Sequence, residues 1–523
     1  MTRDEMREAL EDARDLPDGD EKIAALERLL AHADAAGDLR LGMDIRFELI
    51  EAYHDHTERW RLLPAFDWCL AAHDRDPSLF TDRHAEMLRW YHKWAVATLR
   101  STPRVDLDET LAALDDMERR FRESGQSPQI IYNLRCGIAD HLGDEAAARE
   151  WLAKWRATPP DENSDCAGCD PSRQAELLAG WGEWAEAVAT VEPVLSGMVG
   201  CTEQPEKALV AIMLPHLHLG RYAEAAAAHV RAYRRHRFER DSVGYLAEHL
   251  RFCALTGHHA RGLDILEEHL GWLDRPYDEA SAMEFAAAGA LVCRVAHANG
   301  LGARLLHRPE HGERRAAEVP LARLGADLAA TARNLARRFD DRNGTDHQSQ
   351  RMESWLAAAP LTTELELPPD EPDGAELTVG SPPEQWRDVL APLTVESIAA
   401  VLDARGDRYA VDADDVIRGR WADAYLHFDR LGERQEILHT RILAARQLPA
   451  DRLADALEFC NAWNHDKVFP KAYVHDTGEG QLILAGDVTT DLEHGVTGAQ
   501  LAVLIHATVA TATAYAAAVA ALP

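Results

Sequence analysis

The chain has 523 residues, of which 46% are hydrophobic and 28% charged, as in globular proteins rather than disordered ones. Its formal net charge of −33 repels phosphate groups, so nucleic acid and anionic membrane surfaces are not expected as partners. Eight thinly spread cysteines do not make a disulfide framework, and the first residues hold no apolar run, so we expect a cytoplasmic protein.

Residues 1–340 carry a helical pattern nearly throughout. Apolar residues recur at intervals of three and four, as at Ile23, Leu26, Leu29 and Leu30. This spacing places the apolar side chains on one face of a helix, and the alternation typical of strands is absent. The sequence therefore predicts an all-α region here.

A short motif repeats within this region. Gly182 and Gly220 are each followed by an aromatic residue two positions later and by alanine five positions later, and looser copies begin at Gly143 and Gly257. A glycine in the left-handed conformation commonly ends a helix. Because the copies are 37 to 39 residues apart, they predict a solenoid of helix pairs.

The run LGRYAEA (residues 219–225) resembles the tetratricopeptide repeat. The resemblance implies a TPR-like α-helical repeat solenoid over residues 1–340, with an extended groove that binds a protein or peptide. Aromatic side chains often anchor such partners, so Trp184 and Tyr222 are candidate partner-binding residues.

The segment from residue 231 to 240 is basic within an acidic chain. It contains Arg231, Arg234 and Arg235. One interpretation is a binding site for an acidic peptide or another anion, and the alternative is a solvated helix face neutralised by acidic neighbours.

The sharpest chemical signal is a pair of cysteines, Cys166 and Cys169, with Cys201 further along the chain. A Cys-x-x-Cys turn can place two thiolates on one zinc ion. In a stack of helix pairs the loops before Pro171 and Pro205 would be neighbours, which would bring Cys201 to the pair.

A fourth ligand for this site has no regular spacing in the sequence. The candidates are Asp165, Asp170 and Cys136. Three interpretations stay open, namely a structural zinc ion, a redox pair and ordinary reduced cysteines. No other cofactor is expected.

Residues 341–390 are predicted to be a linker, because their second half is rich in proline and acidic residues. From residue 391 to 523 the pattern changes to the order α-β-β-β-β-α-β-β-α. It predicts a helix around residues 398–402, strands over 409–411, 416–418, 426–428 and 438–442, a helix over 451–463, strands over 471–475 and 481–487, and a final helix. This order favours an α+β domain with an antiparallel sheet.

The final helix is unusually apolar. Residues 501–522 contain no Asp, Glu, Lys or Arg, and their number suffices for a membrane span. They are mostly Ala, Thr and Val, however, so we expect no membrane anchor but a helix with a covered face. The cover would be its own sheet or a partner, including a second copy of the chain in a homodimer.

The runs LEFCNAWN (457–464), FPKAYV (469–474) and GVTGAQL (495–501) resemble the YbjN family. The resemblance covers roughly residues 391–523. It implies a fold similar to type III secretion chaperones and the role of a bacterial sensory-transduction regulator. The family is not known for enzymes, and it supplies no catalytic residue.

Motifs of phosphate-binding loops, zinc proteases and serine hydrolases are absent from the sequence. We therefore expect a non-enzymatic bacterial adaptor or regulatory protein that binds a protein or peptide through the repeat groove and the YbjN-like domain. One alternative is a metal- or redox-responsive regulator that uses Cys166, Cys169 and Cys201. A second alternative is an enzyme whose site follows no known motif.

Overall fold

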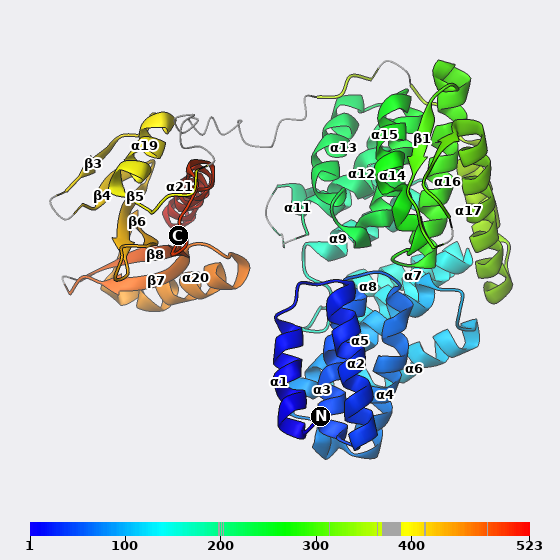
Figure 1. The fold of residues 1–523 in the computed structure, drawn as a ribbon, viewed down its shortest axis with the longest axis horizontal. Helices are drawn as coiled ribbons and strands as arrows, with labels where there is room; N and C mark the ends of the chain where they lie inside the picture. Colours follow the sequence, from blue (N-terminus) through cyan, green and yellow to red (C-terminus); the bar gives the residue numbers. More distant parts are fainter. Residues whose placement is uncertain are drawn as a thin grey trace. The chain divides into compact units, whose positions relative to one another are not determined.

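The computed structural model describes residues 1–196, 199, 201, 203–312, 314–362, 365–368, 389–412, 415–478 and 480–522. The chain divides into two units, Met1–Asp370 and Glu371–Pro523 (Figure 1). We call the first the helical unit and the second the α+β unit, and describe each by itself.

The described residues of the helical unit form helices and one short hairpin of strands. The helices are α1 (Arg3–Arg14), α2 (Asp20–Ala36), α3 (Leu39–His54), α4 (Leu62–Arg75), α5 (Asp82–Ser101), α6 (Leu107–Glu123), α7 (Gln129–Leu142), α8 (Glu145–Ala157), α9 (Cys169–Gly180), α10 (Trp184–Thr190), α11 (Glu192–Leu195), α12 (Glu206–His218), α13 (Tyr222–His236), α14 (Val243–Leu255), α15 (His259–His269), α16 (Glu279–Ala296), α17 (Leu321–Asn343) and α18 (His347–Ala357).

The four repeated glycines lie where the motif predicted them, between paired helices. Gly143, Gly182, Gly220 and Gly257 have φ angles of 83°, 80°, 72° and 81°. They separate α7 from α8, α9 from α10, α12 from α13 and α14 from α15, and each of these pairs packs together. Successive pairs also touch, since α9 contacts α12 and α12 contacts α14. The predicted pairs of helices are therefore confirmed for this stretch, whereas a TPR-like solenoid stays a prediction.

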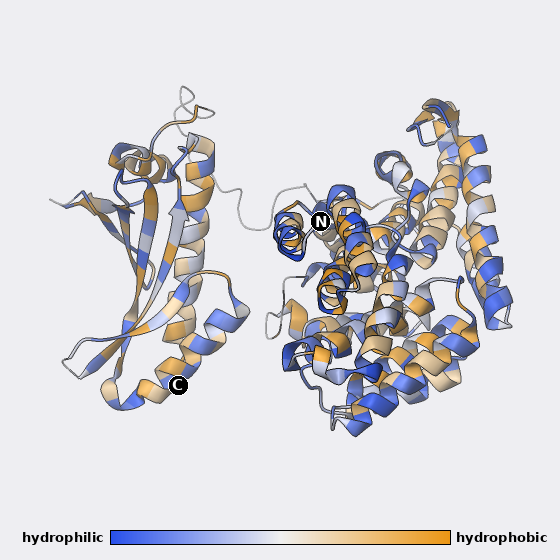
Figure 2. Ribbon diagram, turned by 60° about the horizontal axis from the view of Figure 1, so that its bottom comes forward, coloured by the Kyte–Doolittle hydropathy of each residue, from blue (hydrophilic) through white to orange (hydrophobic). Residues whose placement is uncertain are grey.

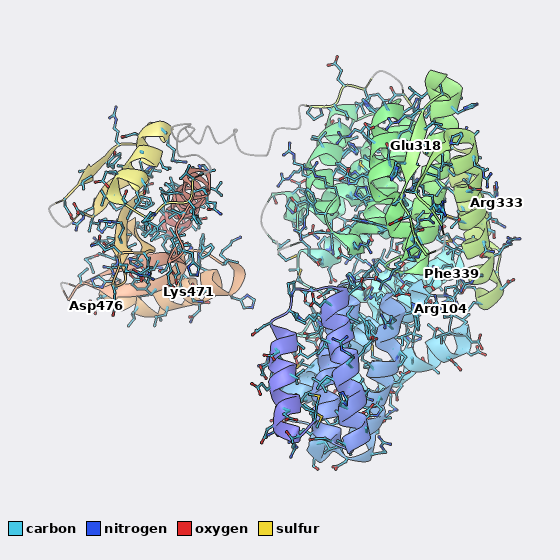
Figure 3. All side chains as sticks on the ribbon, viewed as in Figure 1. Arg104, Glu318, Arg333, Phe339, Lys471 and Asp476 are labelled. Carbon is cyan, nitrogen blue, oxygen red and sulfur yellow. The ribbon has the colours of Figure 1, made fainter. Side chains whose placement is uncertain are left out.

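The helical unit also contains contacts between segments far apart in the sequence. Arg342 at the end of α17 donates to the backbone oxygens of Leu99 and Thr102, each at 2.8 Å, near the end of α5. Arg104, labelled in Figure 3, pairs with Glu279 of α16 at 2.5 Å. These contacts tie the first helices to the last ones, an arrangement that neighbour-by-neighbour stacking does not include.

The core of the last helices lies between α14, α16 and α17. Phe339 of α17, labelled in Figure 3, is fully buried there and meets His141 of α7 edge to face, with ring centroids 4.9 Å apart. Hydrophilic and hydrophobic residues alternate along the helical ribbons of this unit in Figure 2, as expected for helices with one buried and one exposed face.

Two features of this unit differ from the sequence-based expectation. Strands β1 (Leu305–Arg308) and β2 (Ala317–Pro320) pair antiparallel in a region expected to be helical throughout. The strand pattern in the sequence is weak here, because Leu306 is the one fully buried side chain of the two strands. The helices also continue beyond residue 340, since α17 ends at Asn343 and α18 occupies part of the predicted linker. Residues 369–388 of that linker lie outside the described residues.

Replacing Gly143 with alanine is expected to destabilise the helical unit by about 3 kcal/mol. A left-handed φ costs a residue with a Cβ about 1–2 kcal/mol, and forcing an atom into a filled space adds about 1–3 kcal/mol. A Cβ at Gly143 would lie 2.5 Å from Nδ1 of His347, at the start of α18. Denaturant unfolding of Gly143→Ala measures this loss.

Gly220→Ala is the matched control, because Gly220 has the same backbone conformation with nothing within 4 Å of the added Cβ. It should lose only about 1–2 kcal/mol. Equal losses for the two variants would contradict the role of the contact with α18.

The described α+β unit holds one antiparallel sheet and three α-helices. They are α19 (Val395–Arg405), β3 (Tyr409–Val411), β4 (Ile417–Trp421), β5 (Ala424–Leu431), β6 (Ile437–Pro449), α20 (Leu453–Asp466), β7 (Lys471–Asp476), β8 (Gln481–Asp491) and α21 (Gly498–Ala520). The strand order is β3-β4-β5-β6-β8-β7. The predicted order of elements and the antiparallel sheet are confirmed.

Helix α21 covers the sheet, and it carries little blue in Figure 2. The Tyr515 hydroxyl is fully buried and donates to the backbone oxygen of Ala485 at 3.0 Å. Among the described residues α21 is the one helix long and apolar enough for a membrane span, and 44% of its most apolar window is buried within the unit. The expected covered face is confirmed, and the cover is the unit's own sheet.

Candidate functional site

The three predicted cysteine ligands come together in the structure. Cys166 and Cys169 flank a tight turn at the start of α9, and Cys201 lies in the segment before α12. The Sγ atoms of all three lie within 4.8 Å of one another, and those of Cys169 and Cys201 are 3.5 Å apart. Helices α9 and α12 pack together, so the stacking of helix pairs produces the convergence that the sequence suggested.

The surroundings favour a thiolate at Cys166. Hydrogen bonds from the Cys169 thiol and from backbone N–H groups lower the pKa of Cys166 to about 5, against the opposing effect of partial burial. The Cys169 N–H lies 3.3 Å from Cys166 Sγ. A thiolate is the form of cysteine that binds metals and attacks electrophiles.

The three residues predicted as a possible fourth ligand interact with other groups instead. Cys136 is buried and donates to the Ala148 backbone oxygen, Asp165 pairs with Lys93 at 3.0 Å, and Asp170 accepts hydrogen bonds from Gln129 and Trp155. These contacts explain why none of the three completes the cysteine cluster.

Sequence reasoning missed Glu203, whose Oε2 atom lies 3.4 Å from Cys169 Sγ. The same oxygen accepts from Lys207 Nζ at 2.6 Å. The position of Glu203 two residues after Cys201 is the signal that was available, but one acidic residue in an acidic chain does not stand out.

The basic segment lies on and just after α13, where acidic residues neutralise part of it. Arg231 and Arg235 lie 3.6 Å and 3.9 Å from Glu206, and Arg235 also pairs with Glu239 at 2.8 Å. Arg234 is half-buried on the same helix. This arrangement favours the solvated helix face over an anion site.

The two aromatic candidates differ from each other. Trp184 is half-buried and stacks on His218 of α12, with ring centroids 4.2 Å apart. Tyr222 is 41% exposed at the start of α13 and therefore does not fill the space between helices. Of the two, Tyr222 is the side chain available to a partner.

A cluster of buried histidines was also missed by sequence reasoning. His229 and His236 of α13 and His249 of α14 are fully buried. Arg261 donates to His229 Nε2 at 2.8 Å, so His229 carries its proton on Nδ1, which faces His249 Nδ1 at 3.0 Å. Burial, and then the charge of Arg261, hold the pKa of His229 well below its usual value. The cluster is therefore neutral at pH 7.

A pocket of about 490 Å³ lies beside α9, with Trp155, Asp170 and Gln174 in its wall. Burial raises the pKa of Asp170 to about 6. No cysteine, serine or histidine is among the described residues that line this pocket. The described lining does include two hydroxyl groups, those of Thr158 and Thr190.

In the α+β unit, Asn464 joins α20 to β7. Its side chain donates to the Ala472 backbone oxygen at 2.8 Å and accepts from the Ala472 N–H at 2.7 Å. This pair of bonds closes the turn between helix and strand, so Asn464 is a structural residue. Four apolar side chains on or just after α20 are instead exposed, namely Leu453, Leu457, Val468 and Phe469.

Residues 394–521 match the sequence model of the YbjN family, which is described as "Putative bacterial sensory transduction regulator". No tetratricopeptide-repeat family matches the chain. No curated protein matches it either. The matched segment begins at the cap of α19 and ends just after α21, so it covers the described fold of the α+β unit.

Proposed function

With a YbjN domain at residues 394–521 as the premise, we propose that this chain is a non-enzymatic regulatory adaptor of a bacterial cytoplasm. It binds a protein or peptide partner. The match to a family of regulators is the observation that carries this proposal. The net charge of −33 favours a neutral or basic partner.

The exposed apolar side chains of α20 supply a contact surface for the partner. We define the α20 surface as Leu453, Leu457, Val468 and Phe469, which are 44%, 46%, 76% and 51% exposed. Leu453 and Leu457 are one helical turn apart and therefore share a face of α20. Exposed apolar groups of this kind are typical of interaction sites, and a few of them dominate binding.

The test is partner capture with the full chain as bait. We expect a protein retained by the natural chain to bind at least ~10-fold more weakly to a Leu457→Glu, Phe469→Glu variant, because a buried unpaired charge opposes docking. Leu431→Glu is the matched control, since Leu431 is 42% exposed at the end of β5. Far-UV circular dichroism checks that all variants fold.

Equal affinity of the partner for both charged variants and the natural chain would exclude the α20 surface. A catalytic turnover found for the chain would overturn the adaptor role itself.

The homodimer through α21 stays a prediction, and sedimentation of the full chain tests it. Val503, 61% exposed on α21, is the position to charge in that experiment.

A further inference from the structure

We propose that Cys166, Cys169, Cys201 and Glu203 bind one zinc ion, which ties the start of α9 to the segment before α12. The site belongs to the helical unit and does not include the α20 surface. The test of zinc binding is therefore independent of the test of the adaptor role.

The sulfur atoms have the spacing of a metal site. Zinc–sulfur bonds of about 2.3 Å in a tetrahedron separate the sulfurs by about 3.8 Å. The Sγ atoms of Cys169 and Cys201 are 3.5 Å apart, and all three pairs are within 4.8 Å. A disulfide requires about 2.05 Å, so the thiols are not bonded to each other. Three sulfurs from segments more than 30 residues apart surround one point.

Each sulfur also faces an N–H donor. Besides the Cys169 N–H on Cys166, the Glu203 N–H lies 3.4 Å from Cys201 Sγ, and the Gln204 side-chain nitrogen lies 3.8 Å from Cys169 Sγ. Such donors stabilise negative charge on ligand atoms and orient them. The loops therefore place a donor beside each sulfur atom, in position to orient the three sulfurs around one metal ion.

Glu203 is the proposed fourth ligand; its carboxylate is close to Cys169 but does not lie within 4.8 Å of all three sulfurs, so it must move toward them to bind the ion. A tetrahedral zinc ion with one oxygen and three sulfur ligands separates oxygen from sulfur by about 3.6 Å. The observed distance between Glu203 Oε2 and Cys169 Sγ is 3.4 Å. Lys207, 2.6 Å from the same carboxylate oxygen, offsets part of the negative charge of four anionic ligands.

The donor set selects the metal. Thiolates are soft ligands that favour zinc, whereas calcium and magnesium require oxygen ligands. Four protein ligands leave no open position, which is the arrangement of structural zinc rather than catalytic zinc. The ion would hold two helix pairs together, since α9 and α12 come from successive pairs.

The experiment titrates zinc into reduced full-length protein against a chelating dye. We expect one equivalent per chain, and cobalt(II) in its place should give the sulfur charge-transfer absorption of a tetrahedral site. Cys169→Ser and Cys201→Ser should abolish binding, and Glu203→Gln should weaken it at least ~10-fold. The controls are Glu206→Gln and Cys293→Ala, which remove a nearby acid and a distant buried thiol.

Zinc should also raise the Tm of the natural chain by at least about 5 °C and leave that of Cys201→Ser unchanged. The exposed Cys166 offers a second variant, Cys166→Ser, should the others not fold. Absence of stoichiometric zinc, with a Cys169–Cys201 disulfide formed under mild oxidation, would overturn the proposal in favour of a redox pair. Unchanged zinc affinity in Glu203→Gln would remove Glu203 from the ligand set.

Discussion

Lowering the pH from 7 to 5 is expected to destabilise the helical unit by about 3 kcal/mol or more, because several buried histidines stay neutral in the fold. Burial lowers the pKa of His92 to about 4, of His236 to about 3 and of His54 to about 2. Their value in an unfolded chain is about 6.5.

The sign follows from which state binds the proton. Above pH 6.5 neither state binds it, and these histidines do not affect stability. Below pH 6.5 the unfolded chain takes up protons that the folded chain refuses, so each histidine lowers the free energy of unfolding by about 1.4 kcal/mol per pH unit. At pH 5 the free energy of unfolding is lower by about 2 kcal/mol for each of the three histidines.

Seven described carboxyl groups of the helical unit oppose this trend, because burial raises their pKa: Asp44, Asp55, Asp67, Asp170, Glu176, Asp241 and Asp278. Burial raises the pKa of Asp55 and of Asp170 to about 6, so the folded chain protonates them before the unfolded chain does. At pH 5, Asp55 and Asp170 each raise the free energy of unfolding by less than about 1 kcal/mol once solvent screening is included. The histidines therefore dominate, and His229 and His249 act in the same direction.

Denaturant unfolding followed by tryptophan fluorescence at pH 7 and pH 5 measures the loss. His236→Phe is the informative variant, because neither ring nitrogen of His236 has a hydrogen-bond partner among the described residues and the ring stacks on Tyr245. It should reduce the difference between the two pH values by about 2 kcal/mol. An unfolding midpoint independent of pH between 7 and 5 would contradict the lowered pKa values of these buried histidines.

Trp155→Ala should destabilise the helical unit by about 3–5 kcal/mol, the usual loss for a large aromatic removed from a core. Trp155 is 1% exposed and belongs to the same buried hydrophobic cluster as Leu152 and Leu178. Its indole N–H donates to Asp170 Oδ2 at 3.2 Å, so the variant also takes a donor from a largely buried carboxylate. Thermal and denaturant unfolding both measure the loss.

Two further variants separate the ring from its hydrogen bond. Trp155→Phe keeps most of the packing and should lose only about 1–2 kcal/mol. Trp184→Ala removes a half-buried ring stacked on His218 and should lose about 1 kcal/mol. A Trp155→Ala variant no less stable than Trp184→Ala would show that the core tolerates the cavity.

The repeat motif predicted the helix pairs well because its glycines have a local physical role. Gly182 and Gly220 need a left-handed φ wherever the chain turns between two helices, whatever the rest of the molecule does. The order of elements in the α+β unit was equally readable, since strands such as Ile437–Pro449 alternate between buried and half-buried or exposed positions. Both predictions therefore depended on local sequence patterns.

What the sequence did not reveal depends on distant contacts. The carboxylate of Glu203 reaches Cys169 only after two helix pairs have stacked. The histidine cluster joins His229 to His249 across two helices, and no spacing rule marks that meeting. The sequence also did not predict the hairpin of β1 and β2. Most of its side chains are not buried, and a strand without a buried face shows no alternation of apolar and polar residues.

The bonds from Arg342 to Leu99 and Thr102 have a consequence for synthesis of the chain. They join residues separated by 243 and 240 positions, so the end of α5 leaves the ribosome long before the residue that caps it. Throughout that interval the nascent helices present carbonyl groups and apolar faces whose final neighbours do not yet exist. We therefore expect the first helices to depend on chaperones during translation, and to reach their final arrangement only once α17 has been made.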